Sequence, residues 1–154
     1  MCMLHLEKAC LEQEDLFYKW INDESVRKNS LHGHFVEYSE HCKWFEEKLQ
    51  NKNSLLLICK RDEEYIGQVR IDFNSEVEGS ISFSIDRQYR GQGFGYRILE
   101  LLETYLKEEF SNRHKRICLI AKVKYENVPS QKCFEKLGYE KESEEEYLIY
   151  KKEI

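Results

Sequence analysis

The feature that most constrains the fold of this chain is a glycine-rich turn at residues 90–95, Arg-Gly-Gln-Gly-Phe-Gly. Before it, Gly79 to Asp86 alternates serine with isoleucine and phenylalanine, which predicts a strand with one apolar face. After it, Phe94 to about Phe110 carries apolar side chains at helical spacing, and a further strand pattern follows at Arg116 to Val123. This order of strand, turn, helix and strand predicts one crossover connection with parallel character.

The rest of the chain predicts further helices and an antiparallel meander. Apolar residues recur at helical spacing near the N-terminus, and the period changes to that of strands after residue 53. We expect helices over Glu12–Asn22, around Val26, over Glu40–Leu49 with Ser39 as its cap, and over Ser130–Leu137 before Gly138, with additional strands over Met3–Ala9, Ser54–Lys60, Tyr65–Phe73 and Tyr147–Lys151. The predicted fold class is α/β, with a mixed, mostly antiparallel sheet flanked by helices.

Composition and charge limit what the chain can bind. The 154 residues suit one domain over residues 1–154, and a net charge of -5 offers no basic surface for nucleic-acid phosphates. Any anionic ligand must therefore be held by local geometry. The longest apolar run, Leu55 to Cys59, is far shorter than the roughly 20 residues that span a bilayer. Because Glu7 and Lys8 come too early for a secretory signal, we expect a soluble cytoplasmic protein without nucleic-acid or membrane contacts.

No metal site is expected. The cysteines show no CxxC spacing and several lie in apolar stretches, which favours reduced, mostly buried thiols: Cys2, Cys10, Cys42, Cys59, Cys118 and Cys133. His32 and His34 flank a glycine without further ligands that the pattern can place. A surface loop and a mobile lid both fit that segment.

The glycine turn has the chemistry of an anion site. Glycine permits positive φ and a close approach of ligand to backbone, and the free amides at a helix start attract negative charge by about 0.3–1 kcal/mol. Arg87 and Arg90 bring side-chain charge to the same place. The turn lacks both the full dinucleotide-binding pattern and the Lys-Ser/Thr of a nucleotide P-loop. On the glycines alone, a plain strand-to-helix turn fits equally well.

The surrounding residues favour the anion site. The spacing Arg-x-x-Gly-x-Gly at Arg90, Gly93 and Gly95 resembles the acyl-CoA pyrophosphate motif of the GNAT superfamily of acetyltransferases. The resemblance continues in the expected order with Phe83-Ser84-Ile85-Asp86 before the turn and with Asn127, Ser130, Phe134 and Leu137-Gly138-Tyr139 after it. Together these motifs cover roughly residues 65 to 140, about half of the chain.

The resemblance implies acetyl-CoA as the cofactor and a sheet with two splayed central strands. Its pyrophosphate would lie on the backbone amides of residues 90–96, and its pantetheine arm would pair with unpaired groups where residues 83–85 part from residues 121–124. The implied cofactor-binding residues are Phe83, Ser84, Ile85, Arg90, Gly91, Gln92, Gly93, Phe94, Gly95, Tyr96, Asn127, Ser130 and Phe134.

The chain departs from the family pattern at the catalytic positions. Many relatives use a tyrosine as the general acid where this chain has Phe134, and a glutamate as the base near Ser80. Neither side chain present can transfer a proton at neutral pH. Tyr139, Tyr125, Cys133 or water could replace the acid, unless the departing thiolate needs none. Glu78 and Asp72 are candidates for the base, although both also fit solvated charges at strand ends.

The N-terminal third resembles a GNAT subgroup that acetylates amino sugars on nucleotide carriers. Fragments at residues 20–30, 40–45 and 67–72 carry this resemblance, which proposes Arg27, Asn29, His41 and Trp44 as substrate-binding residues. Trp44 and His41 fit a structural role in the core equally well.

The expected function is transfer of an acetyl group from acetyl-CoA to a primary amine of a small molecule, with an amino-sugar nucleotide as the best acceptor. Acetylation of a protein N-terminus or a polyamine is an alternative, as is a catalytically silent acyl-CoA-binding module. The sequence leaves a monomer and a homodimer open.

Overall fold

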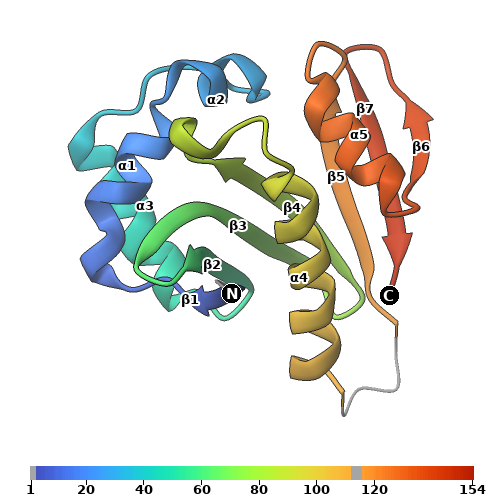
Figure 1. Cartoon of the computed structure of the whole chain (residues 1–154), viewed down its shortest axis with the longest axis horizontal. Helices are drawn as coiled ribbons and strands as arrows, with labels where there is room; N and C mark the ends of the chain where they lie inside the picture. The colour runs from blue at the N-terminus through green and yellow to red at the C-terminus, as the bar shows by residue number, and fades with distance from the viewer. Residues whose placement is uncertain (1–2, 112–115) are drawn as a thin grey trace.

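The computed structural model describes residues 3–111 and 116–154, and over these residues the chain forms one seven-stranded mixed sheet with helices on both faces (Figure 1). The strand order is β1-β2-β3-β4-β5-β7-β6. The strands are β1 (Leu4–Lys8), β2 (Ser54–Arg61), β3 (Glu64–Ser75), β4 (Glu78–Ile85), β5 (Cys118–Lys124), β6 (Glu140–Ser143) and β7 (Tyr147–Glu153). The helices are α1 (Glu14–Ile21), α2 (Glu24–Asn29), α3 (Tyr38–Gln50), α4 (Phe94–Glu109) and α5 (Val128–Lys136), with short 3₁₀ turns at Leu11–Gln13 and Arg87–Tyr89.

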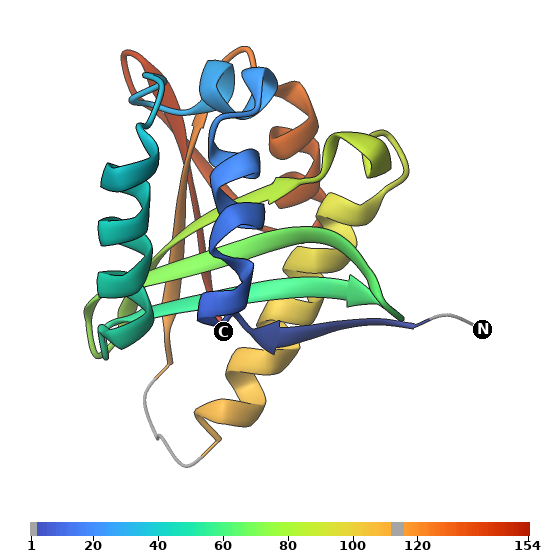
Figure 2. The ribbon, with the colours of Figure 1, turned by 90° about the vertical axis from the view of Figure 1, so that its left-hand side faces the viewer.

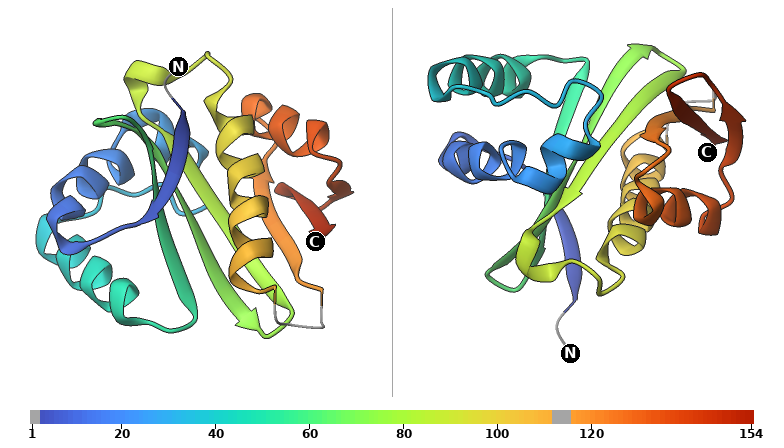
Figure 3. Two further views of the ribbon diagram at one scale, coloured as in Figure 1. Left: turned by 60° about the horizontal axis from the view of Figure 1, so that its bottom comes forward. Right: turned by 90° about the horizontal axis from the view of Figure 1, so that it is seen from above.

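The sheet separates two groups of helices (Figures 2 and 3). α1, α2 and α3 lie on one side of β3 and β4, and α4 and α5 lie on the other. The larger core fills the α4 side, where Val69, Ile71 and Ile81 pack against Ile98 and Leu102. A smaller core on the opposite side holds α1 and α3 against β2.

Apolar and polar side chains alternate along β3 and β4, so the two faces of the sheet differ in character. Residues that face α4 are apolar, whereas their neighbours along each strand are polar and face the α1–α3 side. The register pairs Gln68 with Ser84 and Arg70 with Ser82, so polar side chains are aligned across both strands. The apolar half stabilises the fold by burial, and the polar half lies towards α1–α3, where Asp72 and Arg70 contact Lys48 and Trp44.

The parallel pairing of β4 with β5 is confined to three residue pairs. Glu78, Gly79 and Ser80 pair with Cys118, Leu119 and Ile120, and the two strands part beyond this point. Each strand continues along its outer neighbour, β4 on β3 as far as Ile85 and β5 on β7 as far as Lys124. The predicted crossover through α4 and the predicted parting of the central strands are both present.

Most predicted elements are found, with differences at their ends. α3 begins at Tyr38 with Glu37 at its N-cap, so the prediction of Ser39 as the cap is wrong. α5 begins at Val128, two residues before the predicted start, because the Asn127 side chain caps it and Pro129 suits its first turn. β6 was not predicted, since all four of its residues are exposed and show no apolar alternation.

The predictions about metal ligands and membrane-spanning segments bear on residues 3–111 and 116–154 of the structure. Within that part of the chain, no group of three or more histidine, cysteine or acidic side chains is arranged to hold a metal ion, and no helix is long and apolar enough to cross a membrane. Five of the six cysteines are free thiols there, and Cys2 lies outside the described residues.

A glycine cradle beside two parting strands

The turn before α4 is shaped by two glycines in the left-handed region. Gly91 has φ of 75° and Gly93 has φ of 83°, which side chains other than glycine rarely adopt. A Cβ built on either residue meets no atom within 4 Å, so the space above this backbone is open. Gly93 is the N-cap of α4 and supplies no side-chain hydrogen bond, which leaves the first amides of the helix without an intrahelical partner. We call this segment, residues 90–96, the cradle.

The start of α4 is fixed by close packing on the side away from the open space. A Cβ on Gly95 would lie 3.1 Å from Cys133 Sγ of α5 and 3.3 Å from Phe83 Cε2 of β4. Glycine at this position therefore lets β4, α4 and α5 meet. Open amides on a helix start held this rigidly form a site for an anion such as a phosphate.

Arg90 ties the cradle to the protein rather than projecting into the open space. Its Nη2 donates to Asp23 Oδ1 at 2.9 Å, and its Nε donates to the Ile85 carbonyl at 3.1 Å. Burial alone would raise the pKa of Asp23, but Arg90 and the amides of the α2 start hold it below its ordinary value. The Arg90 guanidinium thus joins the cradle to α2 and to the end of β4, and its backbone begins the open turn.

Asp86 fixes the end of β4 from the other side. Its Oδ2 accepts from Trp20 Nε1 at 2.8 Å and its Oδ1 accepts from the Gln88 amide at 3.0 Å. Burial would raise the pKa of this carboxyl, yet these hydrogen bonds and nearby Lys19 lower it, so Asp86 stays ionised at neutral pH. Asp86 and Asp23 thus anchor the strand and the cradle to α1 and α2.

The parted strands run from the cradle towards the middle of the sheet. We call residues 81–85 of β4 and 121–124 of β5 the fork. Within the described residues, β4 and β5 form no pairs along this stretch, so their facing edges carry unused backbone donors and acceptors. An extended ligand with amide groups can complete these edges as a strand does.

The far wall of the fork is aromatic. Phe134 is 1% exposed, its ring lies edge-on to Phe83 and Tyr139, and it stacks on Tyr150 at 5.4 Å between centroids. Asn127 uses its side-chain oxygen to accept from the Ser130 amide at 3.4 Å, which begins α5. Of the predicted residues in this segment, Phe134 contacts the fork through Phe83, and Asn127 caps the start of α5.

This packing makes Phe134 a poor position for a hydroxyl. Replacing Phe134 with tyrosine should lower the free energy of unfolding by about 1–3 kcal/mol, because the added oxygen enters a filled aromatic cluster. Denaturant unfolding measures the change, with Phe35→Tyr as a control at a 48% exposed ring where we expect almost none. Equal stability of both variants would contradict the packing.

Tyr139 is not placed to supply a proton at the fork. Its ring lies edge-on to Phe134 at 5.0 Å between centroids and 5.6 Å from Lys152 Nζ, so it lies in the core beside Phe134. The side chain is 6% exposed, and its hydroxyl has no hydrogen-bond partner among the described residues. Burial, together with nearby Glu103, raises the pKa of Tyr139 above its ordinary value, so it does not ionise near neutral pH.

The two candidate carboxylates lie on the polar side of the sheet. Asp72 accepts from Lys48 Nζ at 2.7 Å, Arg70 Nε at 2.9 Å and Ser54 Oγ at 2.7 Å. Burial would raise its pKa, but these partners lower it, which makes Asp72 a weak base already occupied by cations. Glu78 is the first residue of β4, on the same face as Ser80 as predicted, and is half-buried at the joined end of the strands.

The structure reveals a polar face that the sequence did not predict. On the side away from α4, three adjacent strands each carry a row of polar side chains. The rows are Gln68, Arg70 and Asp72 of β3; Ser80, Ser82 and Ser84 of β4; and Lys122 and Lys124 of β5. The Arg70 guanidinium lies 5.1 Å from the centroid of the Trp44 ring. We call this set the polar face. The alternation of apolar residues and lysines in residues 119–124 was the available signal, but its orientation depends on the register with β4.

Of the predicted substrate residues, His41 is wrong. It is 0% exposed, its Nε2 is 2.9 Å from the Glu14 carbonyl, and its ring stacks on Phe45, so no ligand can reach it. Trp44 is half-buried on the polar face.

The other two predicted substrate residues, Arg27 and Asn29, lie on α2. The Arg27 guanidinium covers the ring of Phe35 at 5.6 Å. α2 adjoins the fork, since Lys124 Nζ donates to the Lys28 carbonyl at 3.0 Å.

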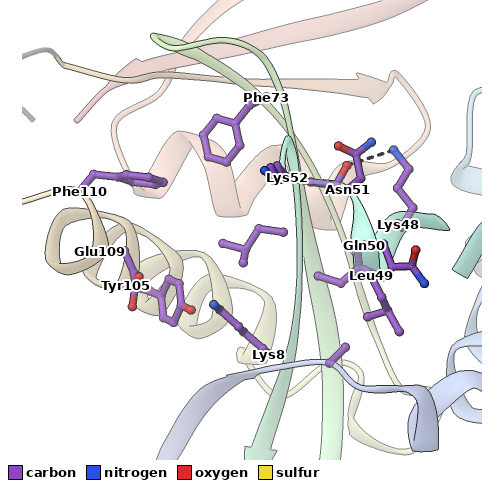
Figure 4. A pocket seen from close by; sticks show the side chains of 14 residues that line it. Lys8, Lys48, Leu49, Gln50, Asn51, Lys52, Phe73, Tyr105, Glu109 and Phe110 are labelled. Atoms are coloured by element: carbon purple, nitrogen blue, oxygen red, sulfur yellow. Dashed lines mark hydrogen bonds between the residues drawn. The ribbon is translucent and has the colours of Figure 1, made fainter. Parts of the chain in front are cut away.

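A pocket of about 370 Å³ lies elsewhere, at the opposite end of α4 (Figure 4). It is lined by the last turn of α3, the first residues of β2, Phe73 of β3, and Tyr105 and Glu109 of α4. Because α4 rises about 1.5 Å per residue, this pocket is about 20 Å from the cradle. It takes no part in the site formed by the cradle and fork.

Comparison with known proteins identifies the family of this chain. The model of the acetyltransferase (GNAT) domain family matches residues 4–140. No curated protein sequence matches the chain.

Among solved structures, the ribosomal alpha-N-protein acetyltransferase RimL in complex with coenzyme A has a TM-score of 0.81 at 15% identity, over 98% of this chain and 94% of that one. Spermidine N-acetyltransferase from Vibrio cholerae in complex with CoA and spermine has a TM-score of 0.80 at 13% identity, over 98% and 94%. N-acetyltransferase PseH from Campylobacter jejuni has a TM-score of 0.72 at 14% identity, over 97% of each chain. At these identities the likeness shows a shared fold.

Proposed function

Because this chain belongs to the GNAT acetyltransferase family, with acetyl-CoA as its cosubstrate, we propose that it acetylates the primary amine of a nucleotide-linked amino sugar. The observation that carries the acetyl-transfer part is the cradle adjoining the fork. Positive-φ glycines with open space above them fit a pyrophosphate, and the unused edges of β4 and β5 fit the amides of a pantetheine arm.

The bound cosubstrate supplies an activated thioester and a thiol leaving group. In this proposal the thioester lies between the two strand edges, where backbone N–H groups of the fork would stabilise negative charge on its carbonyl oxygen. A thiol with an ordinary pKa leaves without a strong acid, which agrees with the absence of a hydroxyl at Phe134.

The amine must lose a proton before or during attack. Asp72 is unsuited because Lys48 and Arg70 already neutralise it. Glu78 faces the polar side at the joined end of the fork and has no ion-pair partner among residues 3–111 and 116–154, so it is the residue we propose as proton acceptor. Water would carry the proton where the amine lies higher in the fork. Acetylation rate should therefore depend on Glu78 more than on Asp72.

The polar face supports an acceptor rich in hydroxyl and phosphate groups. A row of three serines offers hydrogen bonds, Arg70 offers a planar cation, and the Trp44 ring beneath it offers a flat apolar surface suited to a sugar or base. A polyamine would meet cationic side chains at Arg70, Lys122 and Lys124 instead of the carboxylates that bind it best.

The proposal is tested by measuring thiol release from acetyl-CoA with three acceptor classes: UDP-linked amino sugars, peptides with free N-termini, and polyamines. We expect the largest kcat/KM for a UDP-linked amino sugar, and no stimulation by the matching N-acetylated sugar. A faster reaction with a peptide or polyamine contradicts the acceptor assignment. Acetyl-CoA binding without stimulation by any amine favours the silent binding module.

A further inference from the structure

Two lysines stand on the polar face beside the point where β4 and β5 part. Ser80 and Ile120 form the last pair, and Ser82 and Lys122 are the next residues along each strand that face away from α4. Lys124 follows two residues later on the same face. A ligand group that reaches the fork from the polar side therefore passes Lys122 on one strand and Ser82 on the other.

These lysines differ from the other cations on that face because they have no acidic partner. Lys48 and Arg70 both bind Asp72, and Lys151 Nζ lies 3.5 Å from Glu142. Among the described residues, no carboxylate oxygen lies within 4.0 Å of the ammonium group of Lys122 or Lys124, although Glu144 to Glu146 precede β7 nearby. Neither lysine is therefore in a direct ion pair among these residues, in a chain whose net charge is -5.

Both side chains are nevertheless held in place. Lys122 Nζ lies 5.4 Å from the centroid of the Tyr147 ring, and Lys124 Nζ donates to the Lys28 carbonyl at 3.0 Å. A π-face and a carbonyl orient an ammonium group without neutralising it, so each keeps donors for a further acceptor. Arg70 lies on the neighbouring strand β3 and donates weakly to Ser82 Oγ at 3.4 Å.

We propose that Lys122 and Lys124 form a phosphate subsite for the acceptor, distinct from the cradle that takes the cosubstrate pyrophosphate. This inference deepens the proposed function and rests on it, because the two lysines would fix the phosphate end of an acceptor while its amine enters the fork. Phosphate oxygens accept hydrogen bonds from ammonium groups that share one face of a strand, and the subsite selects against acceptors that are themselves cationic.

The subsite can be measured without any turnover. Titration calorimetry of the protein saturated with CoA, which fills the cradle, should detect binding of UDP and inorganic pyrophosphate. We expect the Lys122→Gln, Lys124→Gln double variant to bind UDP at least about tenfold more weakly, and Lys122→Gln alone to show an intermediate loss. Lys151→Gln is the matched control, because it removes a lysine from the same face that already has a carboxylate partner, and should bind UDP as the unaltered protein does.

The outcomes separate this inference from the proposed function. Unchanged UDP binding in the double variant, no UDP or pyrophosphate binding at all, or binding of a dicarboxylate such as malonate in preference to pyrophosphate would each overturn the phosphate subsite. CoA affinity tests the cradle independently, and the Lys151→Gln control should bind CoA as the unaltered protein does. With an active acceptor in hand, the double variant should raise its KM and leave kcat within about twofold, since the lysines hold a part of the substrate that does not react.

Discussion

Replacing Gly93 with valine should weaken acetyl-CoA binding about 100-fold or more while the fold survives. The space above Gly93 is free of protein atoms, so a side chain there meets no obstacle until a ligand approaches the backbone. Valine would occupy that space, and a β-branched residue would also leave the φ of 83° that aims the first amides of α4. Losing two hydrogen bonds to a charged group, at about 1.5 kcal/mol or more each, gives a loss of this size. Calorimetry with acetyl-CoA measures it.

Gly138 provides the matched control for this substitution. It has nearly the same φ, 84°, and equally free surroundings, but it ends α5 rather than opening α4. Gly138→Val should therefore cost comparable stability, about 1–2 kcal/mol for left-handed backbone, without changing acetyl-CoA affinity. Equal affinities for the two variants would refute the cradle assignment, whether both were high or both were low.

Replacing Lys152 with methionine should lower the free energy of unfolding by about 3 kcal/mol, because it leaves Glu103 buried without its cation. Lys152 Nζ donates to Glu103 Oε1 and to the Leu137 carbonyl, each at 2.7 Å, and the Glu103 side chain is 8% exposed. This ion pair joins the middle of α4 to β7 and to the end of α5. Denaturant unfolding at pH 7 measures the loss.

The double variant Glu103→Leu, Lys152→Met separates charge from packing. Replacing both partners with apolar side chains of similar size removes the uncompensated charge, so most of the stability should return. A double variant as unstable as Lys152→Met alone would mean that the methylene groups and the Leu137 contact, rather than the charge pair, hold α4 against β7.

The elements that sequence alone predicts are those with a complete local signal. Helix α4 follows from its apolar spacing, and the stop of α5 follows from Gly138, whose φ is indeed positive. The glycine turn could also be recognised from the sequence, because glycines stand directly before the predicted helix where a capping side chain is usual. β6 gave no signal, since a fully exposed four-residue strand has no alternation to detect.

The parts that were missed depend on contacts between distant segments. Arg90 looked like a free cation beside the glycines, but its partner Asp23 is 67 residues away. Tyr139 was a reasonable acid by residue type, and only its packing against Phe134 shows that its side chain is buried in the core. His41 had the chemistry of a ligand, yet the packing of α1 on α3 buries it. In each case the residue type suggested a role, but the surroundings that decide the role could not be read from the sequence.

The three-pair junction between β4 and β5 also determines how readily the two halves of the sheet separate. Elsewhere, strand pairs extend over four to eight residues, whereas these three pairs alone join the block β1–β4 to the block β5–β7–β6 within the described sheet. The cosubstrate, inserted as an eighth strand, would couple the two blocks into one cooperative unit. Amide hydrogens facing the fork should then exchange rapidly in the free protein, despite their place at the centre of the sheet, and slowly once CoA is bound.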